Sequence, residues 1–336
     1  MIRLSDIVVI APNLKRRLSG VTSTIVRLVP LQARDIGIAT TGPGLPDDLP
    51  HIALWRCALL PRNNMRVWHA RRNTEMLVGL ILRYLFGRRL KLMFTSAAQR
   101  RHSAYTRWLI RRMDHVVATS RKSAAYLEVP HEVIRHGIDL TAFHPSKDKA
   151  AEKAALGLPD VQVVGIFGRV RAQKGNDLFV EALLKVLDRG HHVHGLMIGL
   201  VTDQERGFLE DLKAKIAAAG RTDSFTILDP VDWQDLLCYY RALDLFTAPA
   251  RWEGFGLTPL EAMASGVPAI ATPVGAFEEQ IVDGQTGRII PVDDADALAD
   301  AIAASLADPE VRAEWELAGR ARVEALFAIE REAEKL

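Results

Sequence analysis

Short apolar runs alternate with helical segments along the whole chain, and this alternation constrains the fold more than any other feature. Strands that follow one another across a helix lie parallel, and the helices cover the faces of the sheet. Ligands of such sheets bind beyond the carboxyl ends of the strands. The pattern predicts strands at residues 7–11, 36–40, 67–70, 90–94, 115–118, 132–135, 161–167, 193–198, 224–228, 244–248, 269–272 and 287–290.

The segment Glu253-Gly254-Phe255-Gly256-Leu257-Thr258-Pro259-Leu260-Glu261 places two carboxylates eight positions apart across a glycine-rich turn. Its glycines allow backbone conformations and close approaches that side chains would block. Thr258 is expected to cap a helix whose first residue is Pro259, and the free N–H groups and positive dipole of a helix start suit a phosphate. Glu253 can then reach a hexose hydroxyl, and Glu261 can accept both hydroxyls of a ribose. Two solvated carboxylates beside a turn would be the simpler interpretation without the surrounding motif.

A second glycine-bounded loop, Gly168-Arg169-Val170-Arg171-Ala172-Gln173-Lys174-Gly175, follows the seventh predicted strand and precedes a helix that begins near Asn176. Arg169 and Lys174 are five positions apart and can converge on a diphosphate, whose charge grows as the bond to a leaving nucleotide breaks. The loop is not a Walker motif, because its lysine precedes the glycine and no Ser or Thr follows to hold magnesium. Taken alone, it would be interpreted as an ordinary surface loop.

The carboxylate motif continues into Ala262-Met263-Ala264-Ser265-Gly266-Val267-Pro268-Ala269-Ile270-Ala271-Thr272 and is followed by Asp283-Gly284-Gln285-Thr286-Gly287. Together these segments resemble the signature of the retaining glycosyltransferases of family 4. The resemblance implies an α/β fold of the GT-B type, with two Rossmann-like domains whose parallel sheets face a central cleft. It also implies a nucleotide sugar as the co-substrate.

The resemblance assigns roles to individual residues. It implies that Glu253 holds the donor sugar and Glu261 the ribose, and that Arg169 and Lys174 match the Gly-Arg…Lys-Gly pair of the family. Arg169, Lys174 and Glu253 are therefore the catalytic candidates. The loop from Pro12 to Val21, which leads into a helix over 22–28, contains the glycine that approaches the donor phosphates in this family. The implied donor-binding residues are Gly20, Gly168, Gly254, Phe255, Gly256, Leu257, Glu261 and, for the base, Val231.

A chain of 336 residues is long enough for two domains of ordinary size. We expect an N-terminal acceptor-binding domain over residues 1–144 and a C-terminal nucleotide-sugar-binding domain over 145–327. The junction follows His136-Gly137-Ile138-Asp139, which matches a family segment at the interdomain hinge. The resemblance also implies that a final helix, residues 328–336, crosses back onto the first domain.

Charge is distributed unevenly along a chain whose formal net charge is only +2. Residues 1–144 carry 23 Lys and Arg against 9 Asp and Glu, a balance of +14, and the remainder carries −12. The N-terminal half is therefore expected to meet something anionic. Basic and aromatic residues mix over 80–89 and 105–113, which suits either interfacial helices on an anionic membrane or core helices with basic outer faces. Nucleic acid is disfavoured, because no aromatic-interleaved recognition motif is present.

Cations also follow two strands of the N-terminal half, at the edge where an acceptor would bind. Their side chains could hold acceptor carboxylates or phosphates. The acceptor-binding candidates are Arg71, Arg72, Arg100, Arg101 and His102.

Many members of the family have a histidine where this chain has Phe94, and this departure puts the acceptor-side chemistry in doubt. His102 or His69 is the candidate replacement, although a lone histidine is more often structural. No metal site is expected, because neighbours on a strand point to opposite faces and the histidines at 191, 192 and 194 are better interpreted as surface residues.

Other classes of protein fit the composition poorly. Cys57 and Cys238 have no metal-like spacing and indicate a reducing, cytosolic compartment. The apolar run from Met76 to Leu82 is far shorter than the roughly 20 residues of a membrane-spanning helix. Residues 1–12 lack the features of a signal peptide.

The segments 69–73, 94–103 and 135–139 also resemble the bacterial lipopolysaccharide core mannosyltransferases, which use GDP-mannose and extend the inner-core Kdo region. The resemblance implies metal-independent, retaining transfer of a hexose to an anionic glycolipid at the cytoplasmic face of the membrane. A transferase of exopolysaccharide or lipid-carrier glycans that uses another nucleotide sugar remains open. A sugar-nucleotide epimerase of the same fold and a nucleic-acid-binding protein are the remaining alternatives.

Overall fold

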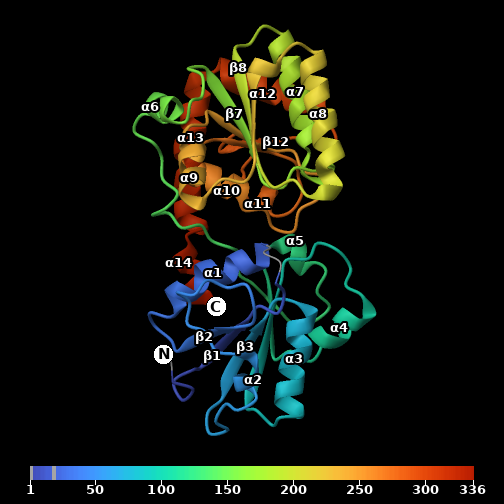
Figure 1. Ribbon diagram of the computed structural model, residues 1–336, viewed down its shortest axis with the longest axis vertical. Coiled ribbons are helices and arrows are strands. Elements are labelled where there is room, and N and C mark those ends of the chain that lie inside the picture. The colour runs from blue at the N-terminus through green and yellow to red at the C-terminus, as the bar shows by residue number, and fades with distance from the viewer. Residues whose placement is uncertain (1–2, 17–19) are drawn as a thin grey trace. The chain divides into compact units, whose positions relative to one another are not determined.

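The chain divides into two units in the computed structural model, which describes residues 3–16 and 20–336 (Figure 1). The N-terminal unit comprises Met1–Gly137 with Ile329–Leu336, and the C-terminal unit comprises Ile138–Ala328. The junction therefore precedes the region near residue 144 in which the sequence placed it. The physical reason is that Ile138 and Phe143 are buried in the core of the C-terminal unit.

The N-terminal unit is built on a six-stranded parallel sheet of order β2-β1-β3-β4-β5-β6. Its strands are β1 (Val9–Pro12), β2 (Ile38–Thr41), β3 (Arg66–Ala70), β4 (Leu90–Ser96), β5 (His115–Ala118) and β6 (Glu132–Val133). Its helices are α1 (Gly20–Gln32), α2 (Leu54–Cys57), α3 (Asn73–Tyr84), α4 (Ala104–Ile110), α5 (Arg121–Ala124) and α14 (Ile329–Lys335).

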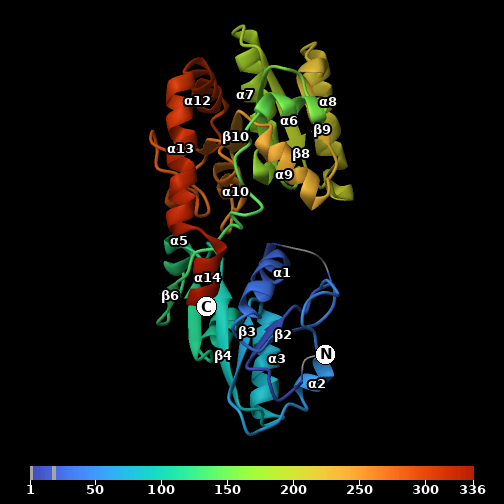
Figure 2. The same ribbon diagram turned by 90° about the vertical axis from the view of Figure 1, so that its left-hand side faces the viewer.

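The last helix, α14, returns to the N-terminal unit, as expected, and packs beside α1 (Figure 2). The carboxylate of Glu332 lies 2.7 Å from the backbone nitrogen of Gly137 and 2.7 Å from Nδ1 of His136. Leu336 packs against a small buried cluster of Met93, Val117 and Ile134. Polar and apolar contacts thus both hold the end of the chain on this unit.

The C-terminal unit is built on a second six-stranded parallel sheet, of order β12-β11-β10-β7-β8-β9. Its strands are β7 (Gln162–Phe167), β8 (Val193–Ile198), β9 (Phe225–Leu228), β10 (Leu245–Ala248), β11 (Ala269–Ala271) and β12 (Gly287–Ile289). Its α-helices are α6 (Lys149–Ala155), α7 (Asn176–Asp188), α8 (Arg206–Ala218), α9 (Trp233–Arg241), α10 (Thr258–Ala264), α11 (Phe277–Gln280), α12 (Ala295–Ala307) and α13 (Pro309–Leu326).

Helices cover both faces of the C-terminal sheet (Figures 1 and 2). Val163 and Phe167 of β7 pack on one face with α9, α10, α11 and α13. Val164 and Ile166 pack on the other with α7, α8 and α12. This alternation follows from the period of two along a strand, and it explains why strands buried on both faces are continuous apolar runs.

All the predicted strands are present in the predicted order, and their ends differ by at most two residues. The predicted helix over 22–28 is longer, since α1 begins at Gly20 and ends at Gln32. In the loop that precedes it, residues 17–19 lie outside the part of the chain that the structure describes.

Both sheets reverse their strand order once. In the first, β2 lies on one side of β1 and β3 on the other; in the second, β8 lies on one side of β7 and β10 on the other. Ligands of open α/β sheets bind at such switch points, beyond the carboxyl ends of the strands. The loops after β1, β3, β7 and β10 are therefore where functional side chains are expected.

Candidate functional site

Two loops meet at the switch point of the C-terminal sheet. The loop after β7 holds Lys174 in a short 3-10 turn, η1 (Ala172–Lys174), and the loop after β10 holds Glu253. Nζ of Lys174 donates to Oε2 of Glu253, and these side chains are 25% and 17% exposed. The structure therefore brings two of the three catalytic candidates into contact at an accessible edge of the sheet.

Glycines allow close approaches in both loops: Gly175 lies against the loop after β10, and Gly256 lies against α11. Gly175 has a φ of 76°, and a Cβ there would lie 2.0 Å from the carbonyl oxygen of Pro249. Gly256 has a φ of 80°, and a Cβ there would lie 2.3 Å from the ring of Phe277. No residue with a side chain fits either position without a shift of the backbone or of a buried ring.

Arg169 is half-buried at the start of the first loop, directly after Gly168. The nitrogens of Gly168 and Val170 donate to the carbonyl oxygens of Ile198 and Leu200 at 2.9 and 3.1 Å, so the backbone on both sides of Arg169 is anchored. The half-buried Val231 lies in the loop after β9, at the same edge of the sheet.

Hydrogen bonds also fix the backbone of the glycine-rich turn that follows Glu253. Gly254 donates its backbone N–H to Oε1 of Glu253 at 2.9 Å. The carbonyl oxygen of Phe255 accepts from Ala276, and that of Gly256 accepts from the Gln280 side chain at 2.7 Å. The bonds from Ala276 and Gln280 tie the turn to helix α11.

The prediction that Thr258 caps helix α10 is wrong by one residue. The helix begins at Thr258, Leu257 occupies the capping position, and no side-chain bond caps the helix. The carbonyl oxygen of Leu257 already accepts from the nitrogen of Glu261 at 2.9 Å. Leu257 has helical dihedral angles (φ −94°, ψ −24°), so the first turn forms one residue earlier than the Thr-Pro pattern predicts.

Glu261 is almost buried and does not stand alone. The hydroxyl of Tyr240, in α9, donates to its Oε2 at 2.8 Å. Burial, with the adjacent Glu261 charge and hydrogen bond, holds the pKa of Tyr240 well above its usual range, so the phenol keeps its proton and remains a donor. Tyr240 is not predicted from the sequence, in which it is only an aromatic residue of an apolar stretch.

Arg251 is a second residue near the candidate site that is not predicted from the sequence. It lies two residues before Glu253 and forms ion pairs with Asp177, in the first turn of α7, and with Asp293, after β12. The one available signal was its position beside the carboxylate motif.

The switch point of the N-terminal sheet also contains a polar network. Nη1 of Arg72 donates to Glu75 and to Asn13 at 2.8 Å each, and its Nη2 donates to Thr22 at 3.1 Å. The Glu75 side chain is fully buried and that of Arg72 is 11% exposed. The network joins the loops after β1 and β3, and it commits Arg72 to groups of its own unit. Gly20, the predicted donor-binding glycine of this unit, lies close to Thr22 in the sequence, at the start of α1.

Arg71 contacts His69, with Nη1 donating to its carbonyl oxygen at 3.3 Å. Burial, opposed by the charges of Glu75 and Glu332, lowers the pKa of Arg71 to about 10, so it stays cationic at neutral pH. Among the acceptor candidates, Arg71 is thus a partly buried cation, whereas Arg100 and Arg101 are exposed in the loop after β4.

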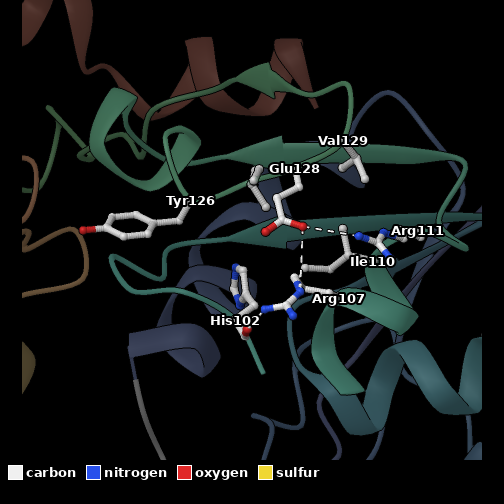
Figure 3. A pocket seen from close by; sticks show the side chains of 8 residues that line it. His102, Arg107, Ile110, Arg111, Tyr126, Glu128 and Val129 are labelled. Atoms are coloured by element: carbon white, nitrogen blue, oxygen red, sulfur yellow. Dashed lines mark hydrogen bonds and ion pairs between the residues drawn. The ribbon is translucent and has the colours of Figure 1, made fainter. Parts of the chain in front are cut away.

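His102 lies in a small pocket beside Arg107, Arg111 and Glu128 (Figure 3). The carboxylate of Glu128 lies 3.7 Å from Arg107 and 3.3 Å from Arg111. Burial, reinforced by nearby arginines, lowers the pKa of His102. The pocket offers only about 10 Å³, roughly the space of one water molecule, so it is too small for a sugar.

Phe94, His69 and His194 are all buried. Phe94 lies inside β4 in the core of the N-terminal unit. His69 is buried in β3, with Nε2 2.7 Å from the hydroxyl of Thr95. The expectation that His194 is a surface residue is wrong, because it points into the core from β8 and lies 2.8 Å from the hydroxyl of Thr226.

An exposed basic and apolar surface lies at the amino ends of β3 and β4. Side chains of α2, of the end of α3 and of their following turns meet there, since Arg62 donates to the carbonyl oxygen of Phe86 and Arg88 to that of Leu60. We call this the α2/α3 surface; its exposed apolar members are Trp55, Leu59, Tyr84, Leu85 and Phe86. On α4, Tyr105 stacks with Trp108, and the guanidinium carbon of Arg112 lies 3.9 Å from the centre of the Trp108 ring. Within residues 3–16 and 20–336, no helix is both long enough and apolar enough to span a bilayer.

Comparison with known proteins complements this geometry. Residues 148–322 match the family model described as Glycosyl transferases group 1. The chain is 52% identical over 337 residues to the lipopolysaccharide core biosynthesis mannosyltransferase LpcC of Rhizobium leguminosarum bv. viciae, with 98% of this chain and 95% of that protein covered. It is 50% identical over 345 residues to the lipopolysaccharide core biosynthesis mannosyltransferase LpsB of Rhizobium meliloti (strain 1021), with 99% and 97% covered. The crystal structure of Anabaena Alr3699/HepE with UDP superposes with a TM-score of 0.86 at 18% identity over 97% of each chain, a likeness in fold alone.

Proposed function

The chain belongs to the glycosyl transferases group 1 family and is a glycosyltransferase with the GT-B fold, and we propose that it transfers mannose from GDP-mannose in assembly of the lipopolysaccharide core. The observation that carries the proposal is the contact of Lys174 with Glu253 at the switch point between β7 and β10. A cation for the leaving diphosphate and a carboxylate for the sugar then stand side by side. The names of the two relatives at 52% and 50% identity support mannose as the sugar.

The proposed reaction exchanges one bond at the anomeric carbon for another. The bond to the diphosphate oxygen breaks, the bond to the acceptor hydroxyl oxygen forms on the same face, and the departing phosphate oxygen takes the hydroxyl proton. Arg169 and Lys174 stabilise the negative charge that develops on the diphosphate. Glu253 orients the hexose and Glu261 accepts from the ribose. No protein base and no metal ion are needed in this scheme.

The proposed acceptor is an anionic glycolipid that contains acidic sugars such as Kdo. The support is the balance of +14 over residues 1–144, with cations at the strand ends in Arg71, Arg100 and Arg101. A carboxylate-bearing acceptor suits arginine, whose planar fork can donate two parallel hydrogen bonds. We place the enzyme at the inner face of the membrane, bound through the α2/α3 surface, where apolar side chains enter the headgroup zone and arginines meet lipid phosphates.

A transfer assay tests the proposed activity. Purified protein is incubated with a Kdo-containing lipid acceptor and a panel of GDP-, UDP- and ADP-sugars, and the anomeric configuration of the product is determined by NMR. We expect transfer from GDP-mannose, retained α configuration and no loss of rate with EDTA. Lys174→Ala and Glu253→Ala each should lower kcat by about 10²-fold or more.

Lys215→Ala serves as the matched control, because this exposed lysine pairs with Glu181 away from the strand ends and should leave kcat unchanged. Inversion at the anomeric carbon, or near-normal turnover by Lys174→Ala, would refute the proposed mechanism. Transfer from a different nucleotide sugar would refute mannose while leaving the site intact.

A further inference from the structure

Arg251 joins the two loops that form the candidate donor site. Its Nη1 and Nη2 donate to the two carboxylate oxygens of Asp177, each at 2.8 Å. Nη1 also donates to the carbonyl oxygen of Ala172, and Nε donates to Asp293. The backbone nitrogen of Arg251 donates to the carbonyl oxygen of Gln173 at 2.9 Å. We call Arg251, Asp177, Asp293 and the Ala172 carbonyl group the Arg251 cluster.

In this cluster, the guanidinium group of Arg251 connects the segments that follow three strands. Ala172 and Asp177 follow β7, Arg251 follows β10, and Asp293 follows β12. The Asp177 hydrogen bonds, with a smaller contribution from Asp293, raise the pKa of Arg251, which therefore remains a cation. Its planar fork fits the Asp177 carboxylate in two-point geometry, which a lysine cannot reproduce.

The backbone at Asp293 is also adapted to this contact. Asp293 has a φ of 61°, and among the described residues it is the one non-glycine residue with positive φ. Aspartate and asparagine tolerate the left-handed region better than most residues, yet the conformation still has a cost and persists only where the surroundings determine it. Here the strained residue presents its carboxylate to Arg251.

Further bonds connect the same two loops next to the catalytic candidates. Nε2 of Gln173 donates to the carbonyl oxygen of Trp252 at 3.2 Å. Lys174 and Glu253 are the next residue on each side, and they form the ion pair of the site. The position of Lys174 relative to Glu253 therefore depends on how firmly these loops are joined.

We propose that Arg251 is a positioning residue for glycosyl transfer, which holds Lys174 and Glu253 in register for the donor before it binds. The inference rests on the proposed donor site and adds to it a residue that acts through Lys174 and Glu253. Charged groups that are already in place stabilise a developing diphosphate charge without reorganisation during the reaction. A displacement of about 1 Å at such a site can cost about 10²-fold in rate.

The test compares Arg251→Met and Arg251→Lys with Arg189→Met. Arg189 is the matched control, because it is an exposed arginine of the same unit that pairs with Asp300. We measure kcat and KM for GDP-mannose, the unfolding temperature, and hydrogen exchange of residues 168–175 and 249–257. Arg251→Met should lower kcat by about 10²-fold with a smaller change in KM, and Arg251→Lys should restore little of it. Exchange should accelerate in both segments, while Arg189→Met should behave as wild type.

Arg251→Met with kcat within about twofold of wild type would overturn the proposal even if its unfolding temperature fell, since Arg251 would then contribute to stability alone. If Arg251→Met fails to fold, Asp293→Asn replaces it, because asparagine tolerates the same backbone and removes one charged arm. Asp293→Asn should lower kcat and speed hydrogen exchange of both segments, and wild-type values of both would contradict the positioning role of the Arg251 cluster. A wild-type enzyme that is inactive with GDP-mannose refutes the proposed function, whereas unchanged exchange in Arg251→Met refutes the positioning role independently.

Discussion

At the scale of single residues, the candidate donor site is held together by contacts between side chains that are distant in the sequence. Nζ of Lys174 donates to Glu253 across two loops, and both residues were predicted because their motifs have defined chemistry. Tyr240 and Arg251 were missed, because their importance depends on partners that are distant in sequence. Tyr240 acts on Glu261 from another helix, and an aromatic residue in an apolar stretch gives no sign of such a hydroxyl contact.

Burial of histidines makes the stability of the protein sensitive to acid. Burial lowers the pKa of His194, and it lowers that of His69 well below the usual range, with the charges of Arg71 and His115 adding to the effect. Below a pH of about 6.5 the unfolded chain takes up protons that the folded protein cannot accept. The free energy of unfolding should therefore fall as the pH decreases through and below 6.5.

Urea titrations between pH 8 and pH 5.5 measure this effect. In His194→Gln, whose amide can still reach Thr226, the slope below pH 6.5 should be shallower by up to about 1.4 kcal/mol per pH unit. The same substitution at the exposed His192 is the control and should keep the wild-type slope. Identical slopes in wild type and His194→Gln would show that His194 does not contribute.

At the scale of elements, alternation and apolar content predicted every strand, because strands buried on both faces have few other ways to fold. Helix ends were less predictable, as the start of α10 shows, since the backbone of Leu257 rather than a side chain sets the first turn. Buried charge was unpredictable as well. Arg66 is 2% exposed at the start of β3 and donates to the backbone carbonyl groups of Ile7, Pro61 and Asn64. A residue type that is usually exposed thus provides hydrogen bonds for backbone acceptors inside the unit.

The membrane contact that we propose for the exposed apolar side chains at the ends of α2 and α3 can be tested by substitution. Leu85 is 77% exposed on the α2/α3 surface, and Leu317 is equally exposed on α13 of the other unit. Leu85→Ser should weaken binding to vesicles of phosphatidylcholine with phosphatidylglycerol by about tenfold, because one leucine no longer enters the interface. Leu317→Ser should bind as wild type.

Sedimentation with these vesicles at two salt concentrations provides the measurement. Binding should weaken at high salt, where lipid charge is screened. Equal losses for Leu85→Ser and Leu317→Ser, or binding to uncharged vesicles that is as strong as to anionic ones, would contradict this surface assignment.

At the scale of the whole molecule, each unit has an arginine that joins loops at the switch point of its sheet. Arg72 bonds to Glu75 on the following helix and to Asn13 in the loop after β1, and Arg251 bonds to Asp177 on α7 while it joins the loops after β7 and β10. Arg72 and Glu75 are only three residues apart, but the contacts of Arg72 with Asn13 and of Arg251 with Asp177 were not predictable from local sequence, because each contact joins segments that follow two different strands. The alternating pattern predicted two such sheets, and the switch points predicted where to look.

A crystal structure with GDP bound tests the central claim most directly. We predict that diphosphate oxygens lie within about 3.2 Å of Nζ of Lys174 and of the Arg169 guanidinium, and that the ribose hydroxyls reach Glu261. Lys174 should then have exchanged at least part of its contact with Glu253 for the diphosphate. A diphosphate that contacts neither Arg169 nor Lys174 would contradict the account.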